Sequence, residues 1–330
     1  MAANLCAGAL AAEVDGSIVR PSSINGIVGI KPTVGLLSRT GVMGVAEPQD
    51  TVGPMARTVR DTAILLTAMA GTDTGDPATR DADARRLNDY TSVLSANALN
   101  GARIGVARDC FGHHEGTDAV IDEAVNVLHE LGAEIVDPAL GSYLPLFGDT
   151  ELQFILYQLK ASIDGYLAAH PAAPVKDIQE LIEANRAQAD VVMPYFQQEL
   201  FEMAAACGGL DTPEHIRLAA ECRRLSRQDG IDKVIATHRL DAIVAPTDGH
   251  PAWSIDPIVG DKIKGGCSTP PAMAGYPHVT VPAGYVHGLP IALSFYGPAY
   301  SDSTILGFAY AFEQATQVRR APTFARTVVG

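Results

Sequence analysis

The sequence predicts an α/β protein in which helices flank a mixed central β-sheet and a helical insertion interrupts the chain. Residues 103–136 indicate a strand, a helix and a strand, because short apolar runs flank a stretch with apolar residues at helical spacing. Short β-rich runs return near the C-terminus, at 241–246, 278–282 and 290–295, and each is closed by Pro or Gly.

Helical segments complete the prediction. Between about residues 150 and 240 the pattern is helical with weak breaks, which we interpret as the insertion. Residues 301–319 are expected to form a terminal helix that packs a broad apolar face against the sheet. Residues 57–70 stop at a glycine, as a helix would, and the Ala-rich residues 1–12 also indicate a helix.

The acidic composition excludes several classes of partner. Asp and Glu number 38 against 24 Lys and Arg, and the net charge of -14 opposes attraction to nucleic acid or to an anionic membrane surface. The five cysteines include no Cys-x-x-Cys pair, so neither a disulfide framework nor a zinc ribbon is indicated. Residues 1–12 lack the basic flank of a secretory signal. The sequence therefore predicts a cytoplasmic protein with no nucleic-acid or membrane partner.

Ser17 is the candidate nucleophile. It follows an Asp-Gly pair, and such triplets are common turns, so the triplet alone is a weak signal. Gly16 lets the backbone pass close to a ligand, and the successive N–H groups of residues 14–17 can point together into a nest that holds an oxyanion. A hydroxyl beside such a nest is typical of acyl transfer.

A longer run around Ser17 carries a family resemblance. Residues 13–33 read Glu-Val-Asp-Gly-Ser-Ile-Val-Arg-Pro-Ser-Ser-Ile-Asn-Gly-Ile-Val-Gly-Ile-Lys-Pro-Thr, and matching segments follow at 49–59, 241–247, 251–253, 274–277, 280–284, 288–290 and 309–316. Over essentially the whole chain this pattern resembles the amidase signature family. One departure is Val14, where the family often carries threonine, although the N–H group at this position is kept.

The resemblance implies an amidase, which converts a carboxamide to an acid and ammonia or an amine through an acyl-enzyme on Ser17. The backbone N–H groups of Val14, Asp15, Gly16 and Ser17 would form the oxyanion hole. No metal or organic cofactor is implied, because a nucleophile, oxyanion donors and water suffice for acyl transfer. The expected partner is a small-molecule amide, and a homodimer stays open as the oligomeric state.

The family completes its triad with a buried lysine and a second serine on a cis peptide bond, both upstream of the nucleophile. All six lysines of this chain follow Ser17, and Lys31 lies in a downstream element of the family pattern, so we do not assign it as the base. Residues 1–6 resemble the helix that follows the cis-serine loop. We therefore expect one amidase-like domain over 1–330, truncated at its N-terminus and nearly inactive, because loss of a triad member costs on the order of 10⁴ to 10⁶ in turnover.

Two other functions stay open. The absence of the lysine and the second serine favours a non-catalytic remnant or pseudoenzyme. An amidotransferase A-type subunit is similar to the family too, but the segments around Trp253 and the insertion are more similar to stand-alone amidases. Substrate contacts are expected from residues 152–236, where members of such a family would differ.

The remaining candidate residues have structural interpretations. Trp253 and Tyr276 could line the acyl pocket, but core packing is the favoured interpretation. Nine histidines invite a Ser-His-Asp triad, yet those at 250, 278 and 287 are better explained as surface or strand-end residues. His113, His114 and Glu115 are adjacent on a polar loop, which favours a solvated turn over a metal site.

Overall fold

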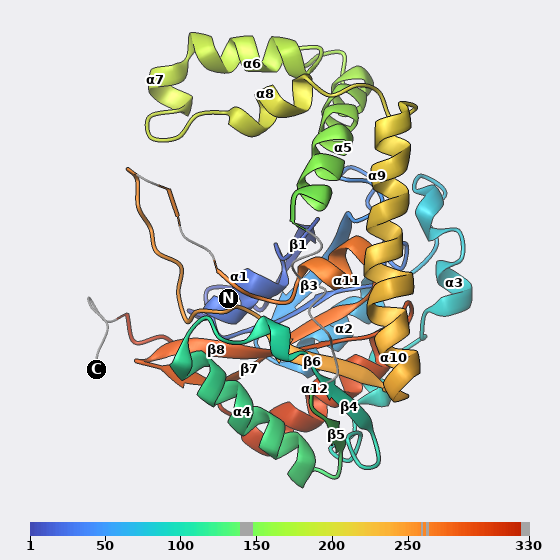
Figure 1. Ribbon diagram of the computed structural model, residues 1–330, viewed down its shortest axis with the longest axis vertical. Helices are drawn as coiled ribbons and strands as arrows, with labels where there is room; N and C mark the ends of the chain where they lie inside the picture. Colours follow the sequence, from blue (N-terminus) through green and yellow to red (C-terminus); the bar gives the residue numbers. More distant parts are fainter. Residues whose placement is uncertain (139–147, 259, 262–263, 325–330) are drawn as a thin grey trace.

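A computed structural model describes residues 1–138, 148–258, 260–261 and 264–324 (Figure 1). Its centre is an eight-stranded sheet with the strand order β1-β3-β2-β7-β8-β6-β4-β5. The parallel pairs are β4 with β5 and β4 with β6, and all the other neighbours are antiparallel. The strands are β1 (Gly8–Glu13), β2 (Val28–Lys31), β3 (Thr51–Ala56), β4 (Arg103–Val106), β5 (Glu134–Val136), β6 (Ala242–Pro246), β7 (His278–Val286) and β8 (Leu289–Tyr296).

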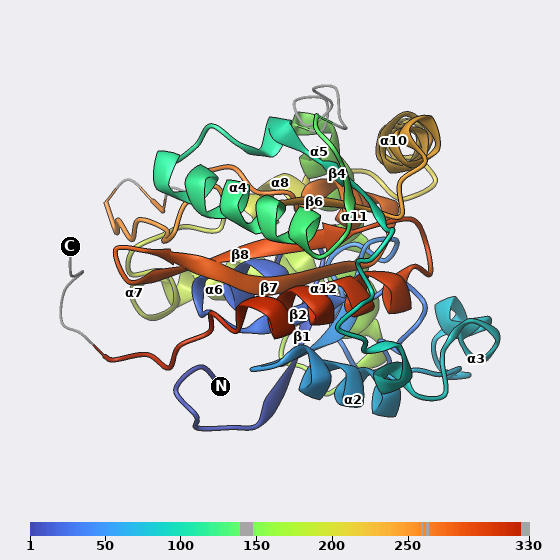
Figure 2. The same ribbon diagram turned by 90° about the horizontal axis from the view of Figure 1, so that it is seen from below.

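Helices cover both faces of this sheet. One layer is formed by α2 (Val59–Met69), α4 (Glu115–Glu130) and α12 (Asp302–Thr316), which lie on the near side of the molecule in Figure 2. The opposite face carries α1 (Val19–Ile24), α10 (Asp232–His238) and α11 (Thr269–Ala274). Short helical turns complete the body: α3 (Ala82–Arg85), and the 3₁₀ turns Pro77–Thr79, Tyr90–Val93 and Arg108–Cys110.

The largest apolar core lies between the sheet and the layer of α2, α4 and α12. It joins fully buried side chains such as Leu66 of α2, Leu128 of α4 and Phe312 of α12 to those of the central strands. A second cluster on the other face packs Ile231 and Val234 against Ile243 and Tyr296. Because alternate strand residues enter the two clusters, the central strands are buried on both sides.

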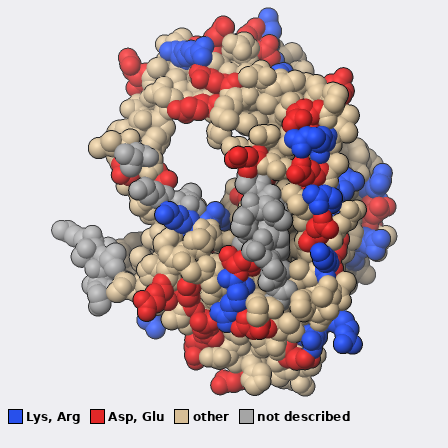
Figure 3. All heavy atoms as spheres, viewed as in Figure 1, with Lys and Arg blue, Asp and Glu red and all other residues tan. Residues whose placement is uncertain are grey.

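The helices between β5 and β6 rise from the body at the top of Figure 1. They are α5 (Gly148–Ala169), α6 (Ile178–Ala187), α7 (Ala189–Val192), α8 (Glu199–Ala205) and α9 (Pro213–Arg223), and a π-helical segment (Arg224–Ile231) joins α9 to α10. Figure 3 shows a hollow between this insertion and the body. In the same view, acidic and basic side chains alternate along α9. Helix α5 has its own small core with α6 and α8, which includes Leu156, Ile163 and Ile182.

Most predicted elements are present. Strands β4 to β8 and helices α2, α4 and α12 lie where the sequence indicated them, and the predicted insertion forms helices. The predicted helix at residues 1–12 is wrong, because residues 8–13 form strand β1, paired with β3 along its whole length. Hydrogen bonding to β3 outweighs the helix propensity of alanine, and Gly8 lets the strand pass close to Leu65 of α2.

A buried polar cluster joins the N-terminal strands to α12. Lys31, at the end of β2, is completely buried, and burial lowers the pKa of its ammonium group to about 8. Asp302, the first residue of α12, accepts hydrogen bonds from Thr33 N–H at 2.9 Å and from Thr33 Oγ1 at 2.6 Å. The charge of Glu13, and then that of Asp302, raises the pKa of Lys31, which partly offsets the effect of burial. Asp302 therefore stabilises both the segment after β2 and a buried charge.

Replacing Asp302 by alanine should lower the free energy of unfolding by about 3 kcal/mol, because it removes the acceptor of two buried donors and one of the negative charges near the buried Lys31. Thr33→Val removes only the hydroxyl and should cost about 1–2 kcal/mol. Urea denaturation at pH 7 measures both values. Equal losses in the two variants would contradict a role for Asp302 in balancing the charge of Lys31.

Candidate functional site

The loop between β1 and α1 carries Ser17. Glu13, the last residue of β1, is 1% exposed, and its Oε2 accepts hydrogen bonds from Ile18 N–H at 2.7 Å and Val19 N–H at 3.1 Å. Gly16 has φ +80°, a left-handed conformation that favours glycine. One carboxylate thus receives the first N–H groups of α1 and folds the intervening residues into a tight turn.

The structure gathers the four predicted oxyanion donors on this turn. The N–H groups of Val14, Asp15, Gly16 and Ser17 donate no hydrogen bond within the described part of the chain. The Ser17 side chain is exposed, and its hydroxyl likewise has no hydrogen-bond partner among the described residues. Val14 packs beside a small apolar cluster that includes Phe154 and Met273. Unpaired N–H groups and a free hydroxyl on one turn are compatible with an oxyanion site, and the role of these residues stays a prediction.

The Asp15 side chain links the turn to helix α11. Its Oδ2 accepts a hydrogen bond from Thr269 Oγ1 at 2.7 Å, at the start of α11. Glu151 of α5 lies within hydrogen-bonding reach of Asp15, and Glu151 Oε1 accepts from Gln49 Nε2 at 3.0 Å. Burial, and then the negative charge of Asp15, raise the pKa of Glu151 to about 9. At neutral pH Glu151 is therefore protonated, and the nearby Asp15 Oδ1 is buried without a hydrogen-bond partner among the described residues.

Lys31 is close enough to this turn to interact electrostatically with Glu13 and Asp15. Its Nζ donates to the Pro32 carbonyl at 3.3 Å, and Lys31 does not line the cavity that contains Ser17. Burial raises the pKa of Glu13, and the charge of Lys31 opposes that rise. The position of Lys31 agrees with its sequence interpretation as a structural residue downstream of the nucleophile.

Arg20 joins α1 to the segment before α11. Its Nε donates to Asp248 Oδ1 at 2.6 Å and its Nη2 to the Gly265 carbonyl at 3.0 Å. The half-buried Trp253 lies 5.6 Å from the Arg20 guanidinium, so the favoured interpretation of Trp253 as a core residue is wrong. Tyr276 is a core residue as expected, and its hydroxyl donates to Asp232. Sequence reasoning missed this role of Arg20 because its partners are more than 200 residues away.

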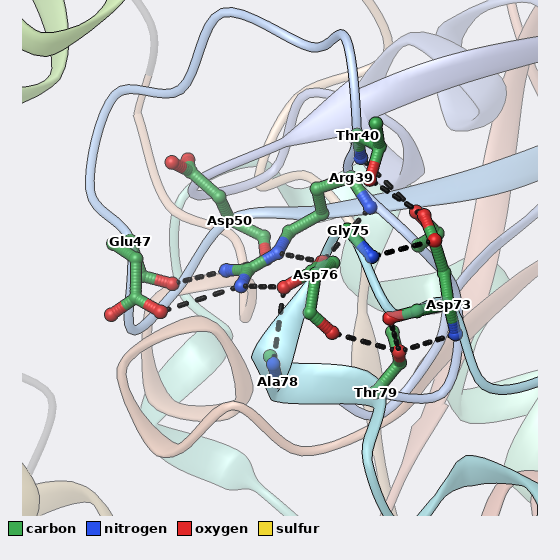
Figure 4. A network of polar contacts seen from close by, with 10 residues as sticks. Arg39, Thr40, Glu47, Asp50, Asp73, Gly75, Asp76, Ala78 and Thr79 are labelled. Carbon is green, nitrogen blue, oxygen red and sulfur yellow. Dashed lines mark hydrogen bonds and ion pairs between the residues drawn. The ribbon is translucent and has the colours of Figure 1, made fainter.

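A cavity of about 410 Å³ opens beside Ser17. Its wall comes from the end of β1, from residues 39–51, from residues 75–76 and from α5, which contributes Ala161, Ser162, Gly165 and Tyr166. The insertion therefore reaches the candidate site, as predicted, through α5. Figure 4 shows Arg39 in this wall between Glu47 and Asp76. Arg39 binds the Asp76 carboxylate through Nε at 2.9 Å and Nη2 at 2.8 Å, which lowers the pKa of Asp76 to about 2.

Two histidines, His278 and His114, make local hydrogen bonds away from Ser17. His278 is completely buried at the start of β7, and its Nε2 lies 2.6 Å from Ser294 Oγ. Burial and the nearby charge of Lys31 lower the pKa of His278 to about 3, so the ring is neutral. His114 caps α4 by accepting a hydrogen bond from Thr117 N–H. Over the described ranges no group of three or more His, Cys, Asp and Glu residues is placed so that it could hold a metal ion.

Two further properties concern the chain as a whole. All five cysteines are free thiols, three of them buried. None of the helices in the described residues is both long enough and apolar enough to cross a bilayer.

Comparison with known proteins shows the family to which the chain belongs. The family model described as Amidase matches residues 1–306. The chain is 34% identical over 329 residues to a protein of Arabidopsis thaliana named "Probable amidase", covering 98% of this chain and 59% of that relative. It is 32% identical to the A-type subunit of the glutamyl-tRNA(Gln) amidotransferase of Thermoanaerobacter pseudethanolicus, with 98% and 66% covered. The structure of native peptide amidase from Stenotrophomonas maltophilia superposes with a TM-score of 0.90 at 42% identity, covering 98% of this chain and 65% of that one.

These matches agree with the mixed sheet and with the Ser17 segment. The chain belongs to the amidase family. It spans about three fifths to two thirds of the length of these relatives.

Gly16→Ala should disturb the turn that carries Ser17. A Cβ at this position would lie 2.5 Å from Arg20 Cδ and 3.0 Å from Ser268 Oγ. Gly41→Ala is the matched control, because Gly41 has φ +82° but open space around it. Both variants carry the left-handed backbone cost of about 1–2 kcal/mol, and Gly16→Ala should lose about 1–2 kcal/mol more. Equal free energies of unfolding for the two variants would show that the turn is not tightly packed.

Glu151→Gln should stabilise the protein at high pH. The pKa of about 9 in the folded state lies above the ordinary value of 4.5, so the folded state binds this proton more tightly and stability falls as pH rises between these values. Glutamine keeps a donor toward Asp15 and an acceptor for Gln49. We expect the variant to gain about 1–3 kcal/mol over the parent at pH 9 and nothing at pH 4.

Denaturant unfolding from pH 4 to pH 9 measures this difference. Glu183→Gln, on the exposed side of α6, is the control and should show no pH-dependent difference from the parent. A Glu151→Gln curve parallel to that of the parent would contradict the raised pKa of Glu151 in the folded state.

Proposed function

We propose that this chain carries the acyl-transfer site of an amidase, with Ser17 as the nucleophile. One observation supports this most directly: the Ser17 hydroxyl stands beside four N–H groups without acceptors in the described residues, at the mouth of a cavity. Membership of the amidase family agrees with this chemistry. The oxyanion donors in this proposal are the N–H groups of Val14, Asp15, Gly16 and Ser17.

The reaction proceeds in two steps. Ser17 Oγ attacks the carbonyl carbon of the amide, and the oxyanion that forms accepts hydrogen bonds from the N–H groups of the turn. The C–N bond breaks, the nitrogen leaves as ammonia or an amine with the proton from Ser17, and an ester to Ser17 remains. Water then cleaves the ester, giving the carboxylic acid and restoring the hydroxyl.

Turnover also requires a base within hydrogen-bonding distance of Ser17. No described residue accepts a hydrogen bond from the Ser17 hydroxyl, and the buried Lys31 donates to a backbone carbonyl. This observation favours a second candidate function, in which the chain binds amides without hydrolysing them efficiently. An amidotransferase A-type role is a further alternative, suggested by the likeness to that subunit.

Peptide amides are the substrates to test first. The similarity to a peptide amidase at 42% identity supports this class. The cavity of about 410 Å³ beside Ser17 can take an amino-acid side chain or a short peptide.

The test combines turnover with labelling of Ser17. Ammonia release from a panel of peptide amides is measured for the chain and for Ser17→Ala, and a fluorophosphonate probe followed by peptide mass spectrometry reports covalent reaction at Ser17. Amidase function predicts labelling of Ser17 and ammonia release that falls at least about 10³-fold in Ser17→Ala.

Other outcomes separate the alternatives. Binding of peptide amides with neither labelling nor ammonia release would support the non-catalytic role. Ammonia release that persists in Ser17→Ala would refute Ser17 as the nucleophile.

A further inference from the structure

The cavity beside Ser17 is lined by four carboxylates and one cation: Glu13, Glu47, Asp50, Asp76 and Arg39. The donors of Arg39 are already used. Besides its two bonds to Asp76, its Nη1 donates to the Glu47 carbonyl at 2.6 Å and the Asp50 carbonyl at 3.4 Å, and its Nη2 donates to Glu47 Oε1 at 3.3 Å. Arg39 therefore pairs with the carboxylates of Asp76 and Glu47. All of its guanidinium N–H groups donate to these partners and to backbone carbonyls, so none is left to donate to a ligand.

Asp50 has no such partner. Its Oδ2 accepts a hydrogen bond from Val45 N–H at 2.8 Å, and no ion pair joins its carboxylate to a Lys or Arg of the described ranges. Figure 4 shows the Asp50 carboxylate turned away from the Arg39 guanidinium, which contacts only the backbone carbonyl of Asp50. A half-buried carboxylate without an ion pair is costly to keep ionised: burial raises the pKa of Asp50, and hydrogen bonds from the backbone and the charge of the nearby Arg39 offset only part of that rise.

A second carboxylate with an unused acceptor belongs to the wall of the same cavity. Glu13 lines the cavity, and its Oε1 is buried without a hydrogen-bond partner in the described structure, whereas its Oε2 holds the start of α1. The rim is apolar by contrast, because the exposed side chains of Val42 and Met43 lie on it. An apolar entrance above acidic acceptors suits a long side chain with an aliphatic stem and a cationic end.

We propose that this cavity is a binding subsite for the acyl part of the substrate, and that Asp50 selects amides bearing a cationic side chain of the lysine type. The inference rests on the proposed function for its placement beside the scissile bond. The aliphatic stem packs on Val42 and Met43, and the ammonium group pairs with Asp50, with Glu13 Oε1 as a further acceptor. No other counter-charge is offered by the described residues of the cavity wall, since Arg39 is held by Asp76 and Glu47.

The experiment compares the affinities of two amides of the same length. Nα-acetyl-lysinamide carries the ammonium group, and Nα-acetyl-norleucinamide lacks it. Calorimetric titration into Ser17→Ala prevents turnover and gives two dissociation constants. We expect the lysine amide to bind about tenfold more tightly, and the ratio to fall to below about twofold when Asp50→Asn is added. Asparagine keeps an acceptor for Val45 N–H, and thermal melting verifies that the variant is folded.

The matched control is Asp190→Asn in the same background, because Asp190 lies exposed on α7 away from the cavity and the substitution changes the net charge equally. It should leave the tenfold ratio intact. Equal affinities for the two amides before any change at Asp50 would overturn the proposal, as would a ratio that survives Asp50→Asn or that Asp190→Asn also abolishes. The titration measures binding and does not require turnover. If the chain releases no ammonia, the proposed function is refuted, but the titration still tests this inference.

Discussion

The candidate site depends on one carboxylate, that of Glu13. It ends an edge strand of the sheet, and its oxygen receives the first two N–H groups of the helix that follows Ser17. This pair of hydrogen bonds closes the chain into a turn of four residues, whose own N–H groups are left without acceptors in the described part of the chain. Without that carboxylate α1 would begin with unsatisfied buried donors, and the direction of the N–H groups near Ser17 would not be fixed.

Glu13 can hold this position because other buried polar groups share its environment. The positive charge of Lys31 interacts with Glu13 and Asp15. Asp302, at the start of α12, interacts with Lys31 and accepts a hydrogen bond from Thr33 N–H. Asp15 accepts a hydrogen bond from Thr269 of α11 and interacts electrostatically with the protonated Glu151 of α5. Segments that are distant in the sequence thus meet near the turn of residues 14–17. Removing one partner from such a network leaves a buried group unpaired, so the site is rigid as long as the network is complete.

The turn that carries Ser17 and the cavity beside it share residues. Glu13, Val14 and Ser17 line the cavity together with residues 39–51, residues 75–76 and one side of α5. Helix α5 is close to both features, because Glu151 interacts electrostatically with Asp15 and because Ser162 and Tyr166 line the cavity. Changes in the insertion can therefore alter the shape of the cavity.

The sequence by itself determined the local features. Periodicity and turn residues located β4 to β8, α2, α4, α12 and the helical insertion, and the Asp-Gly-Ser turn singled out Ser17, because these signals depend on neighbouring residues. Only the tertiary structure decided that residues 8–13 are a strand, that Trp253 lies on Arg20 and that Asp50 lines the cavity without an ion pair. The reason is physical: strand pairing and buried ion pairs join residues that are far apart in the chain, and their energies depend on distances and burial that no local pattern encodes.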